Sequence, residues 1–319
     1  MTSKDISYNF SVAKVLSILM VATGHYFSDT FLWLPTTVAL FIFAFSSGYF
    51  TSIKYNYGFS IAKFWDAKFV RLSYRLLVIN TFLLMLFLVQ KKSGILTWHT
   101  LTAMLGLSGF LNWFKITNQS PFGAGLWFFT VLWMFYLVYP VIAYINQYKK
   151  LAIFYVTCSF VLSIVLTYTV RVGHELWYTI FAFIFGVYIG KFNFTLPTLL
   201  LMAIWVICIV GILGLNLYGN ISILNSFIII IISIVTVLLL LQIKLPEFAF
   251  NKALKLSDCV MEIYFIHSYL LIHNSKHPIY LDFLISLLVI ICFSFALNIL
   301  SNQLKISKNM KIVKENMVN

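Results

Sequence analysis

Apolar residues occur along this chain in runs of 16 to 23, close to the roughly 20 residues that an α-helix needs to cross the hydrocarbon core of a bilayer. Short polar segments separate the runs. The pattern predicts an all-α integral membrane protein, a bundle of about ten transmembrane helices. Their expected ranges are 10–28, 34–53, 72–90, 125–145, 151–170, 175–190, 196–216, 221–241, 257–274 and 279–301.

The longest connection, residues 91–124, fits this pattern less well, because Ile95 to Phe114 is apolar enough to enter the membrane. Gly106 and Gly109 interrupt it, and a cluster of proline and glycine follows. We expect a re-entrant or interfacial helix on the outer side, followed by a turn. An eleventh span is the alternative, but it would invert every later loop and move two lysines, Lys149 and Lys150, to the outside.

Composition and charge agree with the membrane assignment. Hydrophobic residues make up 61% of the chain and charged residues only 10%, against about a quarter in a soluble domain. Of the 22 lysines and arginines, sixteen fall on the predicted inner side, five on the outer side, and Lys14 inside the first span. This positive-inside bias places both termini in the cytoplasm. It also explains the net charge of +13 without a nucleic-acid partner.

The chain is expected to form one transmembrane domain, residues 1–304, and a basic cytoplasmic tail, residues 305–319. The first apolar run is not a cleavable signal peptide, because it is too long, contains Lys14 and leads directly into a second span. The four cysteines lie one each in separate predicted helices with no paired spacing. Neither a disulfide framework nor a metal site is therefore expected.

The first predicted span carries two ionisable residues, Lys14 and His25. Eleven residues at about 100° each return to within roughly 20° of the same face, and the rise is about 16 Å. An ionisable residue inside a membrane helix usually faces the bundle interior or a watery cavity, which makes the pair a candidate functional stripe. The alternative is that Lys14 snorkels to the cytoplasmic head groups and His25 lies in the outer interface.

Two further stretches are candidates for binding. In the second span, Ser46, Ser47 and Gly48 are small enough to admit close helix contact, and ordinary packing is the simpler interpretation. In the sixth span, Gly186 and Gly190 form a GxxxG, which predicts a helix-packing contact. The run before the third span places its basic residues at i, i+3 and i+7, on one expected cytoplasmic face: Lys68, Arg71 and Arg75. A lipid-phosphate anchor explains that spacing alone, whereas arginine also suits a bidentate grip on the phosphates of a cofactor.

The fourth and ninth spans carry the remaining candidates. Trp127 is expected at the outer interface, where an indole is common and where it could also stack on a sugar. Tyr264 and His267 share a helix face at i and i+3, and His267 has both a structural and a catalytic interpretation. Glu262 is the acid placed well inside a span, so it needs a proton or a partner, and Lys14 at similar depth is the candidate partner.

Taken in order, these stretches resemble the integral-membrane acyltransferase family 3. The resemblance rests on the first-helix pair, the Ser-Gly turn, the paired arginines, the Leu-Trp-Phe at the start of the fourth span and the Tyr-x-x-His of the ninth. Lys14 stands where the family has an arginine, which ten intervening residues separate from its histidine. Lysine keeps the charge but lacks the planar fork that grips phosphate or carboxylate bidentately.

The resemblance implies transfer of an acyl group, usually acetyl from acetyl-CoA, to a hydroxyl of a sugar or glycan, in the cytoplasmic (inner) membrane of a bacterium. Neutral His25 would act as general base, with an acyl-histidine intermediate as the variant. Glu262, Tyr264 and His267 are the other catalytic candidates. The implied acyl-CoA contacts are Lys14, Ser47, Lys68, Arg71 and Arg75, and the implied sugar contact is Trp127.

A transporter or flippase for a glycan or a lipid-linked sugar is the competing function, since it would also use many spans and charges within the membrane. Such proteins are often built from repeats with broken helices near the midplane. The sequence shows no internal repeat of the first-helix pair. Acyl transfer is therefore the favoured prediction, with an acyl-CoA, a sugar acceptor and membrane lipid as the expected partners.

Overall fold

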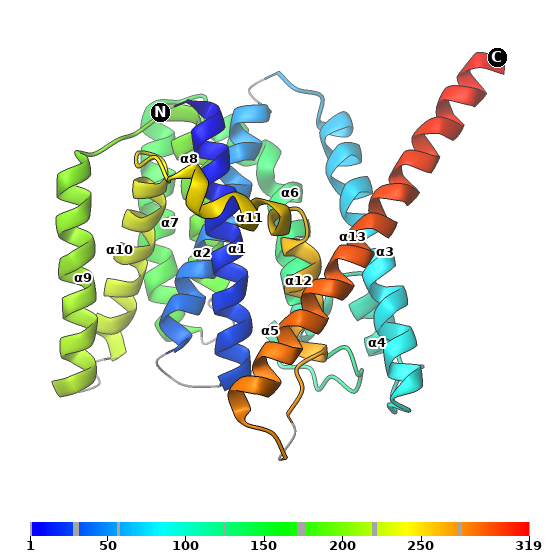
Figure 1. Cartoon of the computed structure of the whole chain (residues 1–319). Helices are drawn as coiled ribbons and strands as arrows, with labels where there is room; N and C mark the ends of the chain where they lie inside the picture. The colour runs from blue at the N-terminus through cyan, green and yellow to red at the C-terminus, as the bar shows by residue number, and fades with distance from the viewer. Residues whose placement is uncertain are drawn as a thin grey trace. The chain divides into compact units, whose positions relative to one another are not determined.

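The computed structural model describes residues 2–27, 32–55, 58–123, 125–170, 176–218, 222–273 and 276–318. Within these ranges the chain forms helices and turns and no strand (Figure 1). The elements are α1 (Ser3–Phe27), α2 (Trp33–Lys54), α3 (Ile61–Val89), α4 (Trp98–Met104), α5 (Ser108–Trp113), α6 (Trp127–Ile145), α7 (Lys149–Thr169), α8 (Leu176–Phe192), α9 (Thr198–Tyr218), α10 (Ser222–Leu240), α11 (Glu247–Ser257), α12 (Val260–Ile266), the 3₁₀ turn η2 (His267–Tyr269) and α13 (Ile279–Val318).

In the part of the chain that the structure describes, seven helices are long and apolar enough to cross a membrane. They lie in α1, α2, α3, α6, α7, α9 and α13. Two further apolar helices, α8 and the part of α10 at Ser226–Leu240, are shorter. The chain is therefore an all-helical, multi-pass membrane protein.

A helix occurs at each expected span except 257–274, where the prediction of one continuous helix is wrong. In that segment α12 and η2 cover Val260–Tyr269, and residues 270–273 are not helical. The ring nitrogen Nδ1 of His267 lies 2.6 Å from the main-chain oxygen of Tyr264, which a continuing α-helix would use for the amide of residue 268. Instead, Leu270 donates its N–H to the oxygen of His267 at 3.2 Å, an i→i+3 bond that tightens the chain.

Two other helices extend beyond their expected ranges. α3 begins at Ile61 rather than at residue 72, because the Ser60 side chain caps it by accepting from the Lys63 N–H at 3.4 Å. The basic stretch before the third span is therefore helical and continuous with that span. α13 continues to Val318, through most of the segment expected as a separate tail.

The long connection after α3 contains two short helices, α4 and α5, of 7 and 6 residues. At about 1.5 Å per residue each is roughly 10 Å long, against about 30 Å of hydrocarbon, so neither can be an eleventh span. Gly106 ends α4 with a positive φ of 74°, and the Leu107 N–H donates to the Thr102 oxygen at 3.0 Å. Gly109, in contrast, does not interrupt a helix, since it lies within α5.

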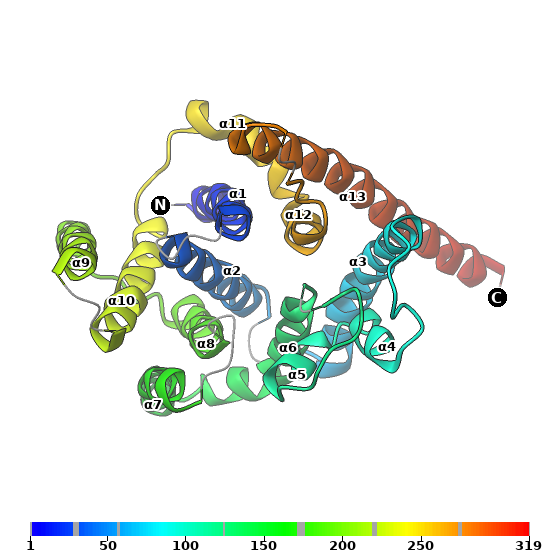
Figure 2. The same cartoon turned by 90° about the horizontal axis from the view of Figure 1, so that it is seen from below.

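The chain divides into two compact units. Unit 1 comprises Met1–Phe59 and Val138–Ser257, and unit 2 comprises Ser60–Leu137 and Asp258–Asn319. In unit 1, α2 packs between α1 and α8, while α7 lies beside α8 and α9 beside α10 (Figure 2). In unit 2, α12 contacts both α3 and α13, and α4 contacts α5.

The closest helix contact of unit 1 joins α2 to α8 through glycines. A Cβ atom on Gly48 would lie 2.2 Å from the main-chain oxygen of Phe183, and one on Gly186 would lie 2.3 Å from that of Phe45. Backbone this close leaves no room for any side chain, as in other small-residue helix pairs in membranes. We call this contact the glycine seam. Stacked rings beside it complete the core, with Phe45 5.7 Å from Phe10 between centroids.

Aromatic pairs also hold the start of α6 to α12 in unit 2. The rings of Phe129 and Phe265 stack with centroids 3.8 Å apart and planes 11° apart. Phe128 lies against Tyr264 at 5.1 Å between centroids. At the end of η2, the Tyr269 hydroxyl donates to the oxygen of Phe122 at 2.5 Å. These contacts fix the short α12 despite its length of one to two turns.

Candidate functional site

The candidate residues fall in both units, and each group is described by itself. Lys14 and His25 lie on α1, which runs unbroken from Ser3 to Phe27, so the rotation and rise expected for the pair apply. His25 is exposed in the last turn of α1, and Lys14 is half-buried. Gly24 is in contact with α2, because a Cβ there would lie 2.6 Å from the Thr36 hydroxyl oxygen.

The Ser-Gly stretch of α2 serves helix packing. Gly48 forms the glycine seam, and Ser46, which is buried, donates its hydroxyl to the Phe43 oxygen at 2.9 Å. The expected packing role of the GxxxG in α8 is confirmed, since Gly186 and Gly190 both face main-chain oxygens of α2. Ser47 is half-buried, and a cofactor contact at this position stays a prediction.

The basic run of α3 keeps its three residues on one helix face, because α3 is continuous from Ile61 to Val89, but the three side chains differ in exposure. Lys68 is only 8% exposed, and its ammonium lies 4.4 Å from the ring centroid of Tyr136 on α6. A cation over an aromatic face is attracted by the ring quadrupole, which compensates part of the lost hydration. Arg71 is exposed, whereas Arg75 is partly buried. Among these three, Arg71 is thus the residue most accessible to a phosphate.

Arg75 pairs with Glu262. Its Nη1 lies 3.1 Å from one carboxylate oxygen and 3.2 Å from the other, and Glu262 is 1% exposed. The Asn298 amide adds a hydrogen bond of 3.4 Å to Glu262 and donates to the Asp258 main-chain oxygen at 2.7 Å. The partner of Glu262 is therefore Arg75, where the sequence suggested Lys14.

A second group links Trp127, Tyr264 and His267, all of them buried. The Trp127 side chain lies close to the hydroxyl of Tyr264. An indole N–H can only donate, so a hydrogen bond between the two would leave the phenol proton for another acceptor. Trp127 is therefore buried inside unit 2 beside Tyr264, and its ring is not exposed at the surface for stacking on a sugar.

The geometry of His267 fixes its tautomer. A carbonyl oxygen can only accept, so the Nδ1 atom 2.6 Å from the Tyr264 oxygen carries the proton. In the neutral ring the lone pair is then on Nε2. The rings of Tyr264 and His267 have centroids 5.9 Å apart, as their shared helix face predicts. Catalytic roles for Glu262, Tyr264 and His267 stay predictions.

The sequence interpretation missed Asn298 as part of this polar group. Asn298 and Asn302 lie four residues apart in the apolar α13, and Asn302 donates to the Asn298 side-chain oxygen at 2.9 Å. Amides at i and i+4 in an otherwise apolar span are the signal that could have found them. Asp282, also on α13, is a second buried acid, and its partner is His277 at 3.1 Å.

Among the described residues, no three histidine, cysteine or acidic side chains gather as a metal site would require. Comparisons with protein-family models, with curated proteins and with solved structures find no match for this chain. The resemblance to the integral-membrane acyltransferases therefore stays a prediction from the motifs.

Proposed function

We propose that this chain is a membrane-embedded O-acyltransferase. It moves an acyl group, with acetyl as the expected group, from cytoplasmic acyl-CoA to a sugar hydroxyl of a surface glycan or its precursor. The observation that carries the proposal is the Lys14 and His25 pair on the single unbroken helix α1, with an exposed imidazole in its last turn. Ionisable groups in an apolar helix are costly and mark a functional path by default.

The proposed topology has ten spans and places both termini in the cytoplasm of a bacterium. Its ninth span is the whole segment 257–274, because α12 and η2 alone, about 16 Å together, are too short to cross the membrane. The excess of lysine and arginine in the inner loops supports this orientation. It puts Lys14 toward the inner end of α1 and His25 about 16 Å farther out. An anionic donor entering from the cytoplasm would meet the ammonium first and the imidazole afterwards.

In the proposed reaction Lys14 attracts a phosphate of CoA as a point charge, and the pantetheine arm extends along α1. Neutral His25 takes the proton of the sugar hydroxyl as its oxygen attacks the thioester carbonyl carbon. The carbon–sulfur bond breaks, and the imidazolium returns the proton to the departing thiolate, which leaves as free CoA. Arg71 is the second phosphate candidate, because Arg75 is already engaged by Glu262.

The test is to incubate purified protein with acetyl-CoA and a sugar acceptor and to measure free CoA by chromatography. Chromatography is preferred to a thiol dye because Cys158 and Cys292 are themselves exposed. Acyl transfer predicts acceptor-dependent release of CoA, and His25→Ala should abolish it while the protein still inserts. His273→Ala, which removes another exposed histidine, is the matched control and should retain activity. Normal activity of the His25 variant would exclude its role as the base.

Two substitutions test the phosphate contacts. Arg71→Ala should raise the KM for acyl-CoA with little change in kcat, because it removes a contact made equally in the ground and transition states. A change confined to protein abundance would instead indicate a lipid anchor. Lys14→Arg keeps the charge and should keep the activity; an inactive but inserted variant would contradict a simple point-charge role.

A further inference from the structure

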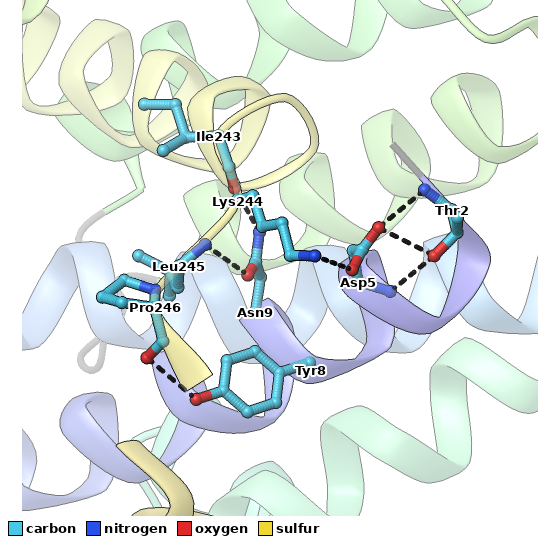
Figure 3. A network of polar contacts seen from close by, with 8 residues as sticks. All are labelled: Thr2, Asp5, Tyr8, Asn9, Ile243, Lys244, Leu245 and Pro246. Carbon is cyan, nitrogen blue, oxygen red and sulfur yellow. Dashed lines mark hydrogen bonds and ion pairs between the residues drawn. The ribbon is translucent and has the colours of Figure 1, made fainter. Parts of the chain in front are cut away.

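One buried amide in unit 1 fixes the connection between α10 and α11. Asn9 of α1 is fully buried, and its Nδ2 donates to the oxygens of Leu240 at 2.8 Å and Ile243 at 2.6 Å (Figure 3). Its Oδ1 accepts the Leu245 N–H at 3.3 Å. The side chain thus satisfies groups that the end of α10 leaves open, which matters where water is scarce.

Two weaker contacts lie beside this amide (Figure 3). The Tyr8 hydroxyl donates to the Pro246 oxygen at 3.3 Å, and the Lys244 ammonium lies 3.5 Å from an Asp5 carboxylate oxygen. The Lys244 side chain is 66% exposed, so this ion pair contributes little to stability. Asn9 is therefore the main link between α1 and the segment that leads into α11.

α11 has the features of a helix that lies in the membrane interface. It has 11 residues, about 16 Å, and so cannot cross the roughly 30 Å hydrocarbon core. In Figure 1 it runs across the direction of α1. Ala253, Leu254 and Leu256 are half-buried, whereas Asn251 and Lys255 are exposed. A helix with one apolar and one polar face settles in the plane of the interface.

The charge of this region is positive. Residues 244–255 contain three lysines and one acid, Glu247, and the first turn of α1 adds exposed Lys4 and the acid Asp5, which makes four lysines against two acids. We propose that α11, with Lys244 and the first turn of α1, binds the phosphates of anionic lipid head groups, and that Asn9 positions this surface. The predicted inner orientation places it at the leaflet where basic segments meet anionic lipid.

The experiment titrates phosphatidylglycerol or phosphatidylcholine into the purified full chain in neutral detergent and counts bound lipid by native mass spectrometry. Each lysine near an anionic surface contributes about fivefold in affinity, so Lys244→Gln with Lys255→Gln should weaken phosphatidylglycerol binding by up to about 25-fold. The matched control is Lys149→Gln with Lys150→Gln, which removes the same charge from two exposed lysines at the start of α7. The control should change binding less than twofold.

Asn9→Ala tests whether the position of the surface matters apart from its charge. The substitution alters no charge, and it should weaken phosphatidylglycerol binding several-fold. Equal losses in the two lysine pairs would overturn the proposal in favour of a general charge effect. A folded Asn9→Ala protein with unchanged binding would overturn the positioning role. Should the Lys244 and Lys255 variant instead lose CoA binding in phosphatidylcholine vesicles, the lysines would serve a soluble phosphate ligand and not the membrane surface. The lysine comparison decides the lipid claim even if Asn9→Ala fails to fold.

Discussion

Replacing Arg75 with glutamine tests the ion pair of unit 2. Glu262 is 1% exposed and would lose its ion pair while keeping the 3.4 Å hydrogen bond from Asn298. Leaving one partner of a buried pair uncompensated costs about 3–5 kcal/mol. Because the Arg75 side chain is itself 22% exposed, we expect the lower end, about 3 kcal/mol, or roughly 150-fold in the equilibrium for local opening of α12. Removing both charges, with Arg75→Gln and Glu262→Gln together, should cost less than about 1 kcal/mol.

The chain contains a reporter for this opening. Cys259 immediately precedes α12 and is 1% exposed. Replacing the other three cysteines by serine leaves it as the sole thiol. The rate at which a maleimide labels Cys259 under native conditions then measures how often α12 opens, provided that closing is faster than labelling. The Arg75 variant should be labelled about 150-fold faster than the parent, and the double variant at nearly the parental rate.

Arg71→Gln is the matched control, since it makes the same substitution one turn earlier on α3 at an exposed position. Its labelling rate should stay within about twofold of the parent, as is usual for exposed charges. Equal rates for the Arg71 and Arg75 variants would show that the pair does not hold α12. Equally fast labelling of the single and double Arg75 variants would show that an unpaired carboxylate is not the cause.

Two more variants test other contacts. Gly48→Ala should lower the Tm by several degrees, because the added Cβ would lie 2.2 Å from the Phe183 main-chain oxygen. Gly214→Ala is the control and should leave the Tm unchanged, because a Cβ at Gly214 would have no atom within 4 Å. Equal effects of the two substitutions would contradict the glycine seam. If the Trp127 indole acts by orienting the Tyr264 phenol, Trp127→Phe should lower kcat without raising the KM for the sugar. The double variant with Tyr264→Phe should then have the same kcat as Tyr264→Phe alone. A raised KM for the sugar alone would instead support stacking.

The positions of the long helices could be predicted because run length and hydropathy largely determine them. α2 was expected at 34–53 and occupies Trp33–Lys54. The break between α12 and η2 could not be predicted, since it depends on a side-chain hydrogen bond from His267 to the carbonyl of Tyr264. Hydropathy averages over a window and does not register one polar contact inside an apolar run.

The candidate site was predicted less well, because pairing depends on which helices are neighbours. Arg75 was grouped with the cytoplasmic charges, although it falls inside the expected span 72–90. An arginine within a span needs a partner, and that was the available signal. Glu262 was correctly expected to need one, but only the contact of α12 with α3 identifies Arg75. The packing glycines of α8 were predicted because small residues four apart have few other uses in a membrane helix.

The glycine seam also constrains how the protein is made. About 120 residues separate the end of α2 from the start of α8, so at 5–20 residues per second α2 would wait roughly 6 to 24 seconds for its partner to be synthesised. During that interval the main chain of α2 exposed at Gly48 must be covered by lipid or by the insertion machinery. Ribosome pausing between α2 and α8 would prolong this exposure, and the yield of correctly assembled protein should fall accordingly.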